Sequence, residues 1–349
     1  AVVAIEVNTG RVIAMASYPN FDPNDFAIPS ELSTEKYNEY FNPDLESFGV
    51  KHIQSTGARG TLDELFPIND DGVRIDKYDL YPRSMLNYAT QGFVPPGSTF
   101  KPITAAIGLS SGKLTTDTTF NYSGLKWQKS SSWGDIYITT LTAYSGAKNI
   151  RNALIHSDNI FFAQAAMQIG STTFCEELKK LGFNESINEQ IKFPLTVKKS
   201  QYSNSDKIDN EKKLADSGYG QGDVLVNPIH MASIYSAFAN DGNMIKPYIK
   251  YKENAQAEIL KENVFSAEIA NTIKDDLIQV VENPEGTAKD MKTAGVTIAG
   301  KTGTAEIKES KEDTSGTELG WFAIYTAEKD IECPILIISM VEDVKGRGG

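Results

Sequence analysis

The chain has 349 residues, 40% of them hydrophobic and 23% charged, and a formal net charge of −12. This length suits one large domain or two smaller ones, and the acidic balance argues against nucleic acid as the main partner because phosphate binding needs a basic protein face. Three widely separated histidines and two cysteines without Cys-x-x-Cys spacing predict no metal site, no disulfide framework and no cofactor.

The two ends of the chain predict strands. Residues 1–17 are typical of a hairpin in which “AVVAIEV” and “RVIAMAS” are the strands and Asn8-Thr9-Gly10 is the turn. Near the other end, residues 320–326 and 333–341 are apolar, β-rich runs joined by a polar loop. We therefore expect one sheet built from both ends of the chain.

The residues between these ends predict loops and helices. Residues 18–95 are rich in Pro, Asn, Asp and Tyr and only weakly periodic, so we expect long loops with short helices there. Residues 186–215 are polar and lysine-rich, which favours a loop. Helical spacing occurs in five further stretches, namely residues 103–112, 150–170, 172–183, 228–242 and 266–283.

The stretch “PPGSTFKP” places Ser98 three residues before Lys101. The prolines and Gly97 set a sharp entry into an apolar run with helical spacing, so we expect Ser98 at a helix N-terminus with Lys101 on the same face. A partly desolvated lysine beside a serine can lose its proton and act as a base. The alternative is a serine that caps the helix beside a solvated lysine.

A second polar motif, Ser157-Asp158-Asn159, lies within an apolar helical stretch, where polar side chains need partners. If this segment lies near Ser98, Ser157 can relay a proton to a leaving amine, and Asn159 can hold Lys101 and a substrate amide. The alternative is a helix N-cap. We expect His156, which precedes Ser157, to be structural.

A third motif, Lys301-Thr302-Gly303-Thr304, stands in “VTIAGKTGTAEI”. Its small residues suit an edge strand that lets a substrate backbone approach closely. Lys301 would supply a positive charge for a carboxylate, and Thr302 and Thr304 would supply hydroxyls. The motif is not a P-loop, because no Gly-x-x-x-x-Gly-Lys precedes the threonine. The alternative is a turn between strands.

Together and in this order, the three motifs are the set found in penicillin-binding proteins and class A β-lactamases. The chain resembles the transpeptidase domain of class B penicillin-binding proteins over nearly its whole length, in “AVVAIEVNTGRVIAMASYPNFDPN”, “PPGSTFKP” and “GWFAIYT” among other segments. The segments “LKWQKSSSWGD” and “LADSGYGQG” resemble the low-affinity, methicillin-resistance type in particular.

The resemblance implies an α+β fold of the penicillin-binding protein transpeptidase/serine β-lactamase type. In this fold a five-stranded antiparallel sheet is flanked by helices, an all-helical part is added, and the active site lies between them. We expect one such domain over residues 1–349, incomplete at both ends, with its sheet part in about residues 1–30 and 288–349 and its mainly helical part in about residues 31–287.

The resemblance also implies the chemistry of a peptidoglycan D,D-transpeptidase. Ser98 would attack the carbonyl between two D-alanines of a stem peptide, with Lys101 as the base. D-alanine would leave with a proton from Ser157 or Lys101, and the amino group of a second stem peptide would take the acyl group. Backbone N–H groups of Ser98 and Thr304 would form the oxyanion hole, and Lys301, Thr302, Gly303 and Thr304 would hold the terminal carboxylate. β-Lactam antibiotics would stall at the acyl stage.

Other parts of such a protein are expected outside this sequence. They are an N-terminal membrane anchor and pedestal, which would place the domain on the extracytoplasmic face of a bacterial membrane, and a helix after Gly349. A glycosyltransferase in the same cell-wall complex is an expected partner.

Three alternatives stay open from the sequence. A serine β-lactamase shares the fold, but class A uses a Glu-x-x-x-Asn loop, and neither Glu185 nor Glu189 has an asparagine four residues on. A β-lactam sensor domain would be acylated without turnover. A catalytically idle structural domain would not be acylated at all.

Overall fold

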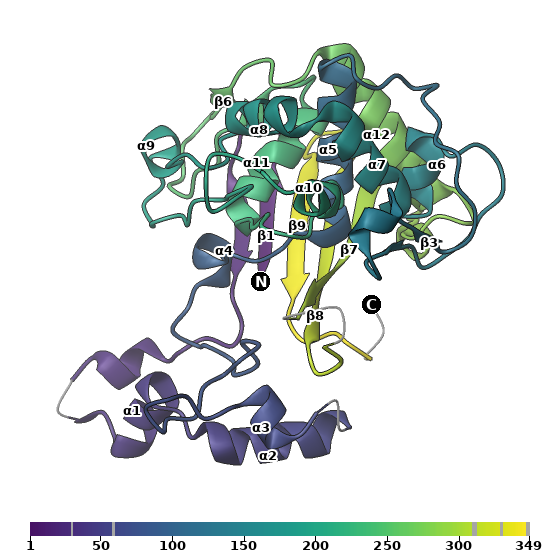
Figure 1. Ribbon diagram of the computed structural model, residues 1–349. Coiled ribbons are helices and arrows are strands. Elements are labelled where there is room, and N and C mark those ends of the chain that lie inside the picture. Colours follow the sequence, from purple (N-terminus) through teal and green to yellow (C-terminus); the bar gives the residue numbers. More distant parts are fainter. Residues whose placement is uncertain (29–30, 58–59, 309–312, 329–330, 347–349) are drawn as a thin grey trace.

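The computed structural model describes residues 1–28, 31–57, 60–308, 313–328 and 331–346, and a five-stranded antiparallel sheet lies at its centre (Figure 1). The strand order is β2-β1-β9-β8-β7, so the first and last strands of the chain pair with each other. The strands are β1 (Val2–Glu6), β2 (Val12–Ala16), β7 (Ile298–Ile307), β8 (Thr317–Thr326) and β9 (Ile335–Val341).

The register of the sheet confirms the expectation that both ends of the chain build it. Val3 lies opposite Ile338, and Ile338 lies opposite Ala323 on the other side. Along β8 and β9, buried and half-buried residues alternate, because successive side chains of a strand point to opposite faces. One face of the sheet is therefore the core face, and β7 is an edge strand.

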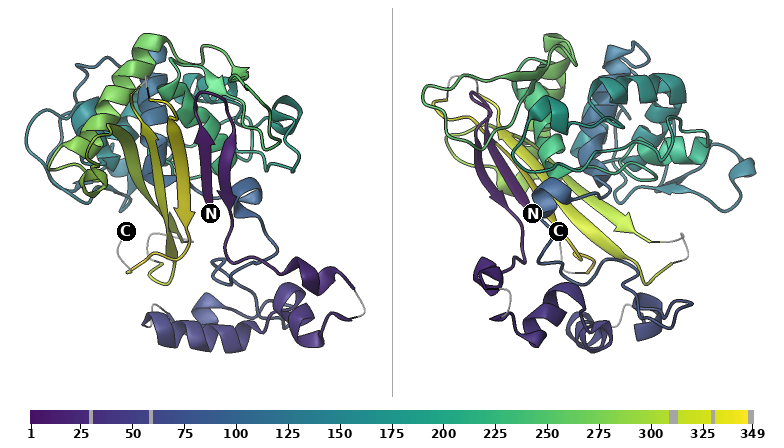
Figure 2. Two further views of the ribbon diagram at one scale, coloured as in Figure 1. Left: turned by 180° about the vertical axis from the view of Figure 1, so that it is seen from behind. Right: turned by 90° about the vertical axis from the view of Figure 1, so that its left-hand side faces the viewer.

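Helices cover this core face, as the view from behind in Figure 2 shows with the strands in front of them. The helix α11 (Pro228–Ala239) packs on β1 and β9, and α12 (Ala267–Glu282) packs on β7. Behind them, α5 (Lys101–Ser110) packs against α12 and α7 (Asn159–Ile169). Because α5 is surrounded in this way, its first eight residues are buried.

The five stretches predicted as helical are helices, with one break. Residues 150–170 form two helices, α6 and α7, because Ser157 takes a left-handed backbone with φ 53°. The segment predicted as a loop, 186–215, contains two short helices, α9 and the start of α10, the latter capped by Asn210.

The remaining helices are α1 (Thr34–Phe41), α2 (Leu45–Thr56), α3 (Leu62–Leu65), α4 (Tyr88–Gln91), α6 (Ile150–Ile155), α8 (Ser171–Lys180), α9 (Asn188–Ile191) and α10 (Glu211–Ser217).

Short elements complete the chain. They are the 3-10 helices η1 (Pro23–Phe26), η3 (Gly97–Phe100), η4 (Ser131–Trp133) and η5 (Lys289–Met291), and the strands β3 (Lys126–Trp127), β4 (Ile138–Thr139), β5 (Met244–Ile245) and β6 (Ile259–Lys261).

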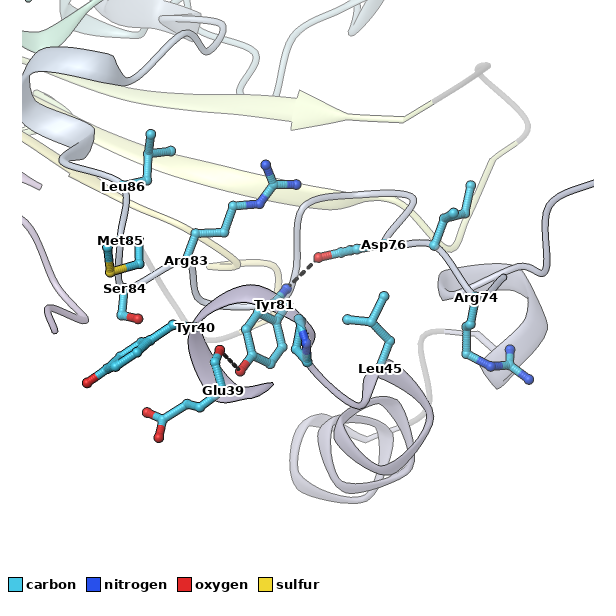
Figure 3. Close-up of a pocket in the computed structure, with 12 residues that line it drawn as sticks. Glu39, Tyr40, Leu45, Arg74, Asp76, Tyr81, Arg83, Ser84, Met85 and Leu86 are labelled. Carbon is cyan, nitrogen blue, oxygen red and sulfur yellow. Dashed lines mark hydrogen bonds between the residues drawn. The ribbon is translucent and has the colours of Figure 1, made fainter. Parts of the chain in front are cut away.

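The helices α1 to α3 lie apart from the main body, in a lobe at the end of the sheet where Ala1 lies (Figure 1). This lobe has a small core of its own, formed by Leu65, Phe66, Tyr78 and Leu80. It also contains a pocket of about 580 Å³ between the region around Tyr40 and Leu45 and the segment 74–86 (Figure 3). None of the residues predicted for the active site lines this pocket.

Candidate active site

Ser98 lies in a 3-10 turn, η3, that leads directly into α5. Lys101 is the first residue of α5, and Pro102 follows it in the first turn, as expected. Gly97 has φ 53°, and a Cβ there would overlap the carbonyl oxygen of Thr304 in β7. The turn can approach the edge strand only because this residue is glycine. The alternative in which Ser98 caps a helix is wrong, since no side chain caps η3 or α5.

Lys101 is fully buried, and its amine lies among serine oxygens. Its Nζ atom is 2.8 Å from Ser98 Oγ, 2.6 Å from the carbonyl oxygen of Ser157 and 3.1 Å from Ser157 Oγ. Burial lowers the pKa of Lys101 well below its usual value; the charge of Lys301 lowers it further, and the charge of Asp158 raises it. The arrangement therefore favours a neutral amine in contact with the Ser98 hydroxyl.

Ser157 joins the two lysines of the site. It occupies the short break between α6 and α7, where its left-handed backbone turns both its carbonyl and its hydroxyl toward Lys101. Its Oγ atom is also 2.9 Å from Lys301 Nζ. A hydroxyl can accept and donate at the same time, so Ser157 can pass a proton between its neighbours.

Asn159 is not placed as the sequence suggested. Its side-chain amide donates to the carbonyl oxygen of Thr139, 2.9 Å away, and no hydrogen bond joins it to Lys101 in the described part of the chain. Asn159 is the first residue of α7, and the residue that caps this helix is Asp158, whose carboxylate accepts from the N–H groups of Ile160 and Phe161. The capping alternative is therefore right for the middle residue of the motif.

Lys301 lies in the edge strand β7, so the alternative of a turn between strands is wrong. Its side chain is fully buried, and its Nζ atom donates to Ser157 Oγ and, at 2.9 Å, to the carbonyl oxygen of Thr302. Burial lowers the pKa of Lys301 to about 7. Its contact with a substrate carboxylate stays a prediction, since the amine is directed toward Ser157.

The other residues of the third motif differ in exposure. Thr304 is exposed, and Thr302 is half-buried, with its hydroxyl 2.9 Å from that of Thr287. Gly303 is buried, and a Cβ there would lie 3.0 Å from the backbone nitrogen of Thr99. The two threonines are thus placed on an edge strand, as predicted, beside the 3-10 turn η3 that contains Ser98 and is called the Ser98 turn below. The close approach of a substrate backbone to this strand stays a prediction.

Three contacts that hold the Ser98 turn could not be predicted from the sequence. The Trp321 indole N–H donates to the carbonyl oxygen of Pro95 at 2.9 Å, and the buried Tyr235 hydroxyl donates to that of Thr99 at 2.6 Å. Between them, the N–H of Gly97 donates to the carbonyl oxygen of Gly220 at 2.9 Å. Each partner lies far along the chain, so no local pattern identifies it.

Among the described residues, no group of three or more His, Cys, Asp or Glu side chains is arranged to hold a metal ion. No helix there is both long enough and apolar enough to cross a membrane.

A serine within hydrogen-bond distance of a buried lysine, with further motifs on a neighbouring helix start and an edge strand, is typical of the serine acyl-transfer enzymes that react with penicillin. A family model described as “Penicillin binding protein transpeptidase domain” matches residues 1–349. The chain belongs to this family and is a transpeptidase domain of the class B penicillin-binding proteins.

Curated relatives are longer than the chain. “Penicillin-binding protein 3” of Bacillus subtilis is 37% identical over 351 residues, which cover 100% of this chain and 45% of that protein. “Peptidoglycan D,D-transpeptidase MrdA” of Acinetobacter baumannii is 23% identical over 338 residues, which cover 88% of this chain and 41% of that protein. The chain therefore spans less than half the length of these two relatives.

Solved structures share the fold. The imipenem acyl-enzyme complex of penicillin-binding protein A from M. tuberculosis matches 98% of this chain and 68% of its own, with a TM-score of 0.71 and 21% identity. The D,D-transpeptidase domain of a peptidoglycan glycosyltransferase from Eggerthella lenta matches 98% of this chain and 73% of its own, with a TM-score of 0.66 and 20% identity. The predicted α+β fold of the penicillin-binding protein type is confirmed.

Proposed function

We propose that the chain is the catalytic domain of a peptidoglycan D,D-transpeptidase that cross-links stem peptides through an acyl-serine intermediate. The observation that carries this proposal is the 2.8 Å separation between Ser98 Oγ and the Nζ atom of the fully buried Lys101. The names of the relatives support the substrate class.

The first half of the reaction forms the acyl-enzyme. The neutral Lys101 amine takes the proton of the Ser98 hydroxyl while Oγ attacks the carbonyl carbon between the two D-alanines. The tetrahedral intermediate then collapses, the C–N bond breaks, and the proton reaches the leaving nitrogen through the Ser157 hydroxyl. A β-lactam follows the same steps, but its leaving nitrogen stays tethered to the acyl group.

The second half transfers the acyl group to the acceptor. The amino group of a second stem peptide attacks the ester carbonyl, the C–O bond to Ser98 breaks, and Oγ regains the proton that the amine loses. The two cross-linked peptides leave as a new amide. In this half Lys101 again takes and returns a proton, since its neutral form is favoured by burial.

Substrate binding is assigned to the edge strand. The Thr302 and Thr304 hydroxyls, with the charge of Lys301 behind them and the small Gly303 between, would hold the terminal carboxylate of the donor. The N–H groups of Ser98 and Thr304 would stabilise the oxyanion, because the Gly97 turn lies against the Thr304 backbone. At the start of α7, the Asn159 side chain would form a hydrogen bond with an amide of the substrate. It would either keep or give up its present hydrogen bond to the Thr139 carbonyl oxygen.

The setting of the domain is part of the same proposal. An N-terminal membrane anchor outside this sequence would hold it at the extracytoplasmic face of a bacterial membrane, where stem peptides are exposed. A glycosyltransferase would work beside it, because new glycan strands must be made before they are cross-linked. The segments that resemble the methicillin-resistance type lead us to expect slow acylation by β-lactams.

Intact-protein mass spectrometry with benzylpenicillin tests the proposal over a time course. Wild type should gain the mass of one penicillin, and Ser98→Ala should gain none. Ser110→Ala is a matched control, since Ser110 also has a lysine three residues on but is exposed at the end of α5. An adduct that forms in Ser98→Ala, or none in wild type at millimolar penicillin, would refute the assignment of Ser98.

Two outcomes would favour the alternatives. A wild-type adduct that is hydrolysed within seconds would indicate a β-lactamase, although Glu185, one candidate for positioning the hydrolytic water, instead contacts Lys261 in β6. A stable adduct without release of D-alanine from a synthetic N-acyl-D-Ala-D-Ala peptide would indicate a sensor. We expect both a stable adduct and D-alanine release.

A further inference from the structure

The backbone of Ser157 is in a conformation that non-glycine residues rarely adopt, at φ 53°. Such a conformation costs free energy and persists only where the surroundings hold it. Here both oxygens of Ser157 depend on it, since its carbonyl and its hydroxyl contact Lys101 together. The two residues on either side of Ser157 must therefore be fixed.

Tyr144 contacts both of those neighbours. Its ring stacks on the imidazole of His156, with centroids 4.1 Å apart and planes inclined by 11°. Its hydroxyl donates to a carboxylate oxygen of Asp158 at 2.9 Å. Tyr122 donates to the same oxygen, but among the described residues the ring that stacks on His156 is that of Tyr144. Tyr144 thus joins the residue before Ser157 to the residue after it.

Tyr144 is itself held in place. The Lys148 ammonium lies 3.2 Å from the centroid of its ring, and the same ammonium donates to the Tyr144 carbonyl oxygen at 2.7 Å. The same ring stacks on His156, so it contacts both a cation and an imidazole. Burial and the charge of Asp158 raise the pKa of Tyr144, so the phenol keeps the proton that it donates.

We propose that Tyr144 is a positioning residue for Ser157, which it holds in the left-handed conformation by fixing His156 and Asp158, and that acylation of Ser98 depends on it. The proposal rests on the function proposed above. Capping of α7 does not explain the contact, because the N–H groups of Ile160 and Phe161 bond to the other oxygen of the Asp158 carboxylate.

The test is the acylation of Tyr144→Phe by benzylpenicillin, measured as the rate constant at saturation and the dissociation constant of the non-covalent complex. Misplacing a catalytic group by about 1 Å can cost about 100-fold in rate. We expect the rate constant to fall about 10- to 100-fold in Tyr144→Phe, and the dissociation constant to stay within about twofold of wild type. Tyr144→Leu, which also loses the stacking, should acylate more slowly still. Tyr251→Phe, at an exposed tyrosine, is the control.

The same Tyr144→Phe substitution in a Ser157→Gly variant distinguishes a role in positioning Ser157 from a general effect on stability. Glycine adopts positive φ freely. Ser157→Gly therefore removes the hydroxyl, and it also removes the need for neighbouring residues to hold a left-handed backbone at position 157. In this background Tyr144→Phe should slow the remaining acylation by less than about twofold, since coupled residues are non-additive. An equal loss in both backgrounds, or an unchanged rate in Tyr144→Phe alone, would overturn the proposal.

Thermal unfolding of each variant accompanies the kinetics. If Tyr144→Phe has no cooperative transition, His156→Leu, which removes the stacking partner together with a contact to the exposed Glu285, takes its place with the same expectations. Failure of the proposed function is a separate result, because wild type itself would then form no adduct at Ser98.

Discussion

Lys101 and Lys301 are two fully buried lysines whose Nζ atoms lie 3.1 and 2.9 Å from one and the same oxygen, the hydroxyl of Ser157. Two ammonium groups this close in a dry site repel each other, and the pKa values of both lysines are lowered, in each case chiefly by burial. The serine hydroxyl lies where a proton passing from one amine to the other would travel. The pair of lysines is therefore the electrostatic centre of the site.

Replacing Lys101 by methionine separates catalysis from stability. Methionine is close in length and has no charge to desolvate, so we expect acylation by benzylpenicillin to fall by about 10² to 10⁴, the usual contribution of general base catalysis. The midpoint of thermal unfolding should stay unchanged or rise, because a buried polar group is removed. Lys113→Met, at an exposed lysine after α5, should change neither property. A wild-type acylation rate in Lys101→Met would rule out Lys101 as the base.

The pH dependence of acylation should respond to Lys301. The reactive form of Lys101 is neutral, so the rate should rise with pH through the folded-state pKa of Lys101, which lies below its usual value. The charge of Lys301 lowers that pKa, so Lys301→Met should raise it and move the acid limb of the rate profile to higher pH. Stopped-flow acylation across pH values gives the midpoint. A shift to lower pH in Lys301→Met would contradict the electrostatic coupling.

Lys301 should also make the folded state more stable as pH rises. With a folded pKa of about 7 against a usual value of 10.5, the unfolded chain binds more protons at this residue between these two pH values. The free energy of unfolding therefore increases with pH between these two values. Below about pH 7, Lys301 is protonated in both the folded and the unfolded state and adds no pH dependence. Denaturant unfolding at pH 7 and pH 9 should show a smaller increase for Lys301→Met than for wild type. Equal increases would show that Lys301 is charged in the folded state.

Gly97 and Gly112 form a matched pair of left-handed glycines, with φ 53° and 65°. A Cβ at Gly97 overlaps the Thr304 carbonyl, whereas a Cβ at Gly112 has no atom of the described residues within 4 Å. Each alanine variant should lose about 1–2 kcal/mol of stability to backbone strain. Gly97→Ala should lose more, and its acylation should fall at least about 100-fold because the turn must move away from β7. Acylation by Gly112→Ala should be normal.

Tyr235 and Tyr325 offer a second comparison. Both are fully buried, but the Tyr235 hydroxyl donates to the Thr99 carbonyl, whereas the Tyr325 hydroxyl has no hydrogen-bond partner among the described residues. Tyr235→Phe should cost about 1 kcal/mol of unfolding free energy and slow acylation, since the Ser98 turn loses a hydrogen bond. Tyr325→Phe should be neutral or stabilising. Denaturant unfolding of the two variants measures the difference. An equal loss of unfolding free energy in both would show that any buried tyrosine hydroxyl has this effect and would contradict the prediction.

Much of the fold was predictable because its signals are local. The apolar, β-rich runs in residues 1–17 and 333–341 and the helical spacing in 266–283 depend on neighbours in the chain, and each predicted element is present. The break at Ser157 was not predicted, because a left-handed serine is held by contacts outside its own segment. The short helix α9 was missed for a similar reason, since Asn188 is tied to Val197 across a loop.

The candidate site was predictable in its motifs but not in its supports. The serines and lysines of the motifs, Ser98, Lys101, Ser157 and Lys301, lie together, as the order of the motifs suggested. The contact expected between Asn159 and Lys101 is absent from the described residues, and Asp158, which was not assigned a role, is the buried member of its motif. Tyr144 belongs to none of the three motifs, and only the fold places it beside the site.

The pairing of β1 with β9 determines when the chain can fold. Of the five strands of the sheet, β1 and β2 are synthesised before the others, but one edge of β1 has no partner until β9 has left the ribosome. Contacts between such distant segments form slowly, and an open strand edge meanwhile invites pairing with other chains. In the strand order, β8 and β9 lie between β7 and β1, so the sheet whose edge strand carries Lys301 is complete only when β9 has paired with β1. A nascent chain therefore cannot complete this sheet until β9 has been added, so termination before β9 yields a fragment with an open, aggregation-prone strand edge.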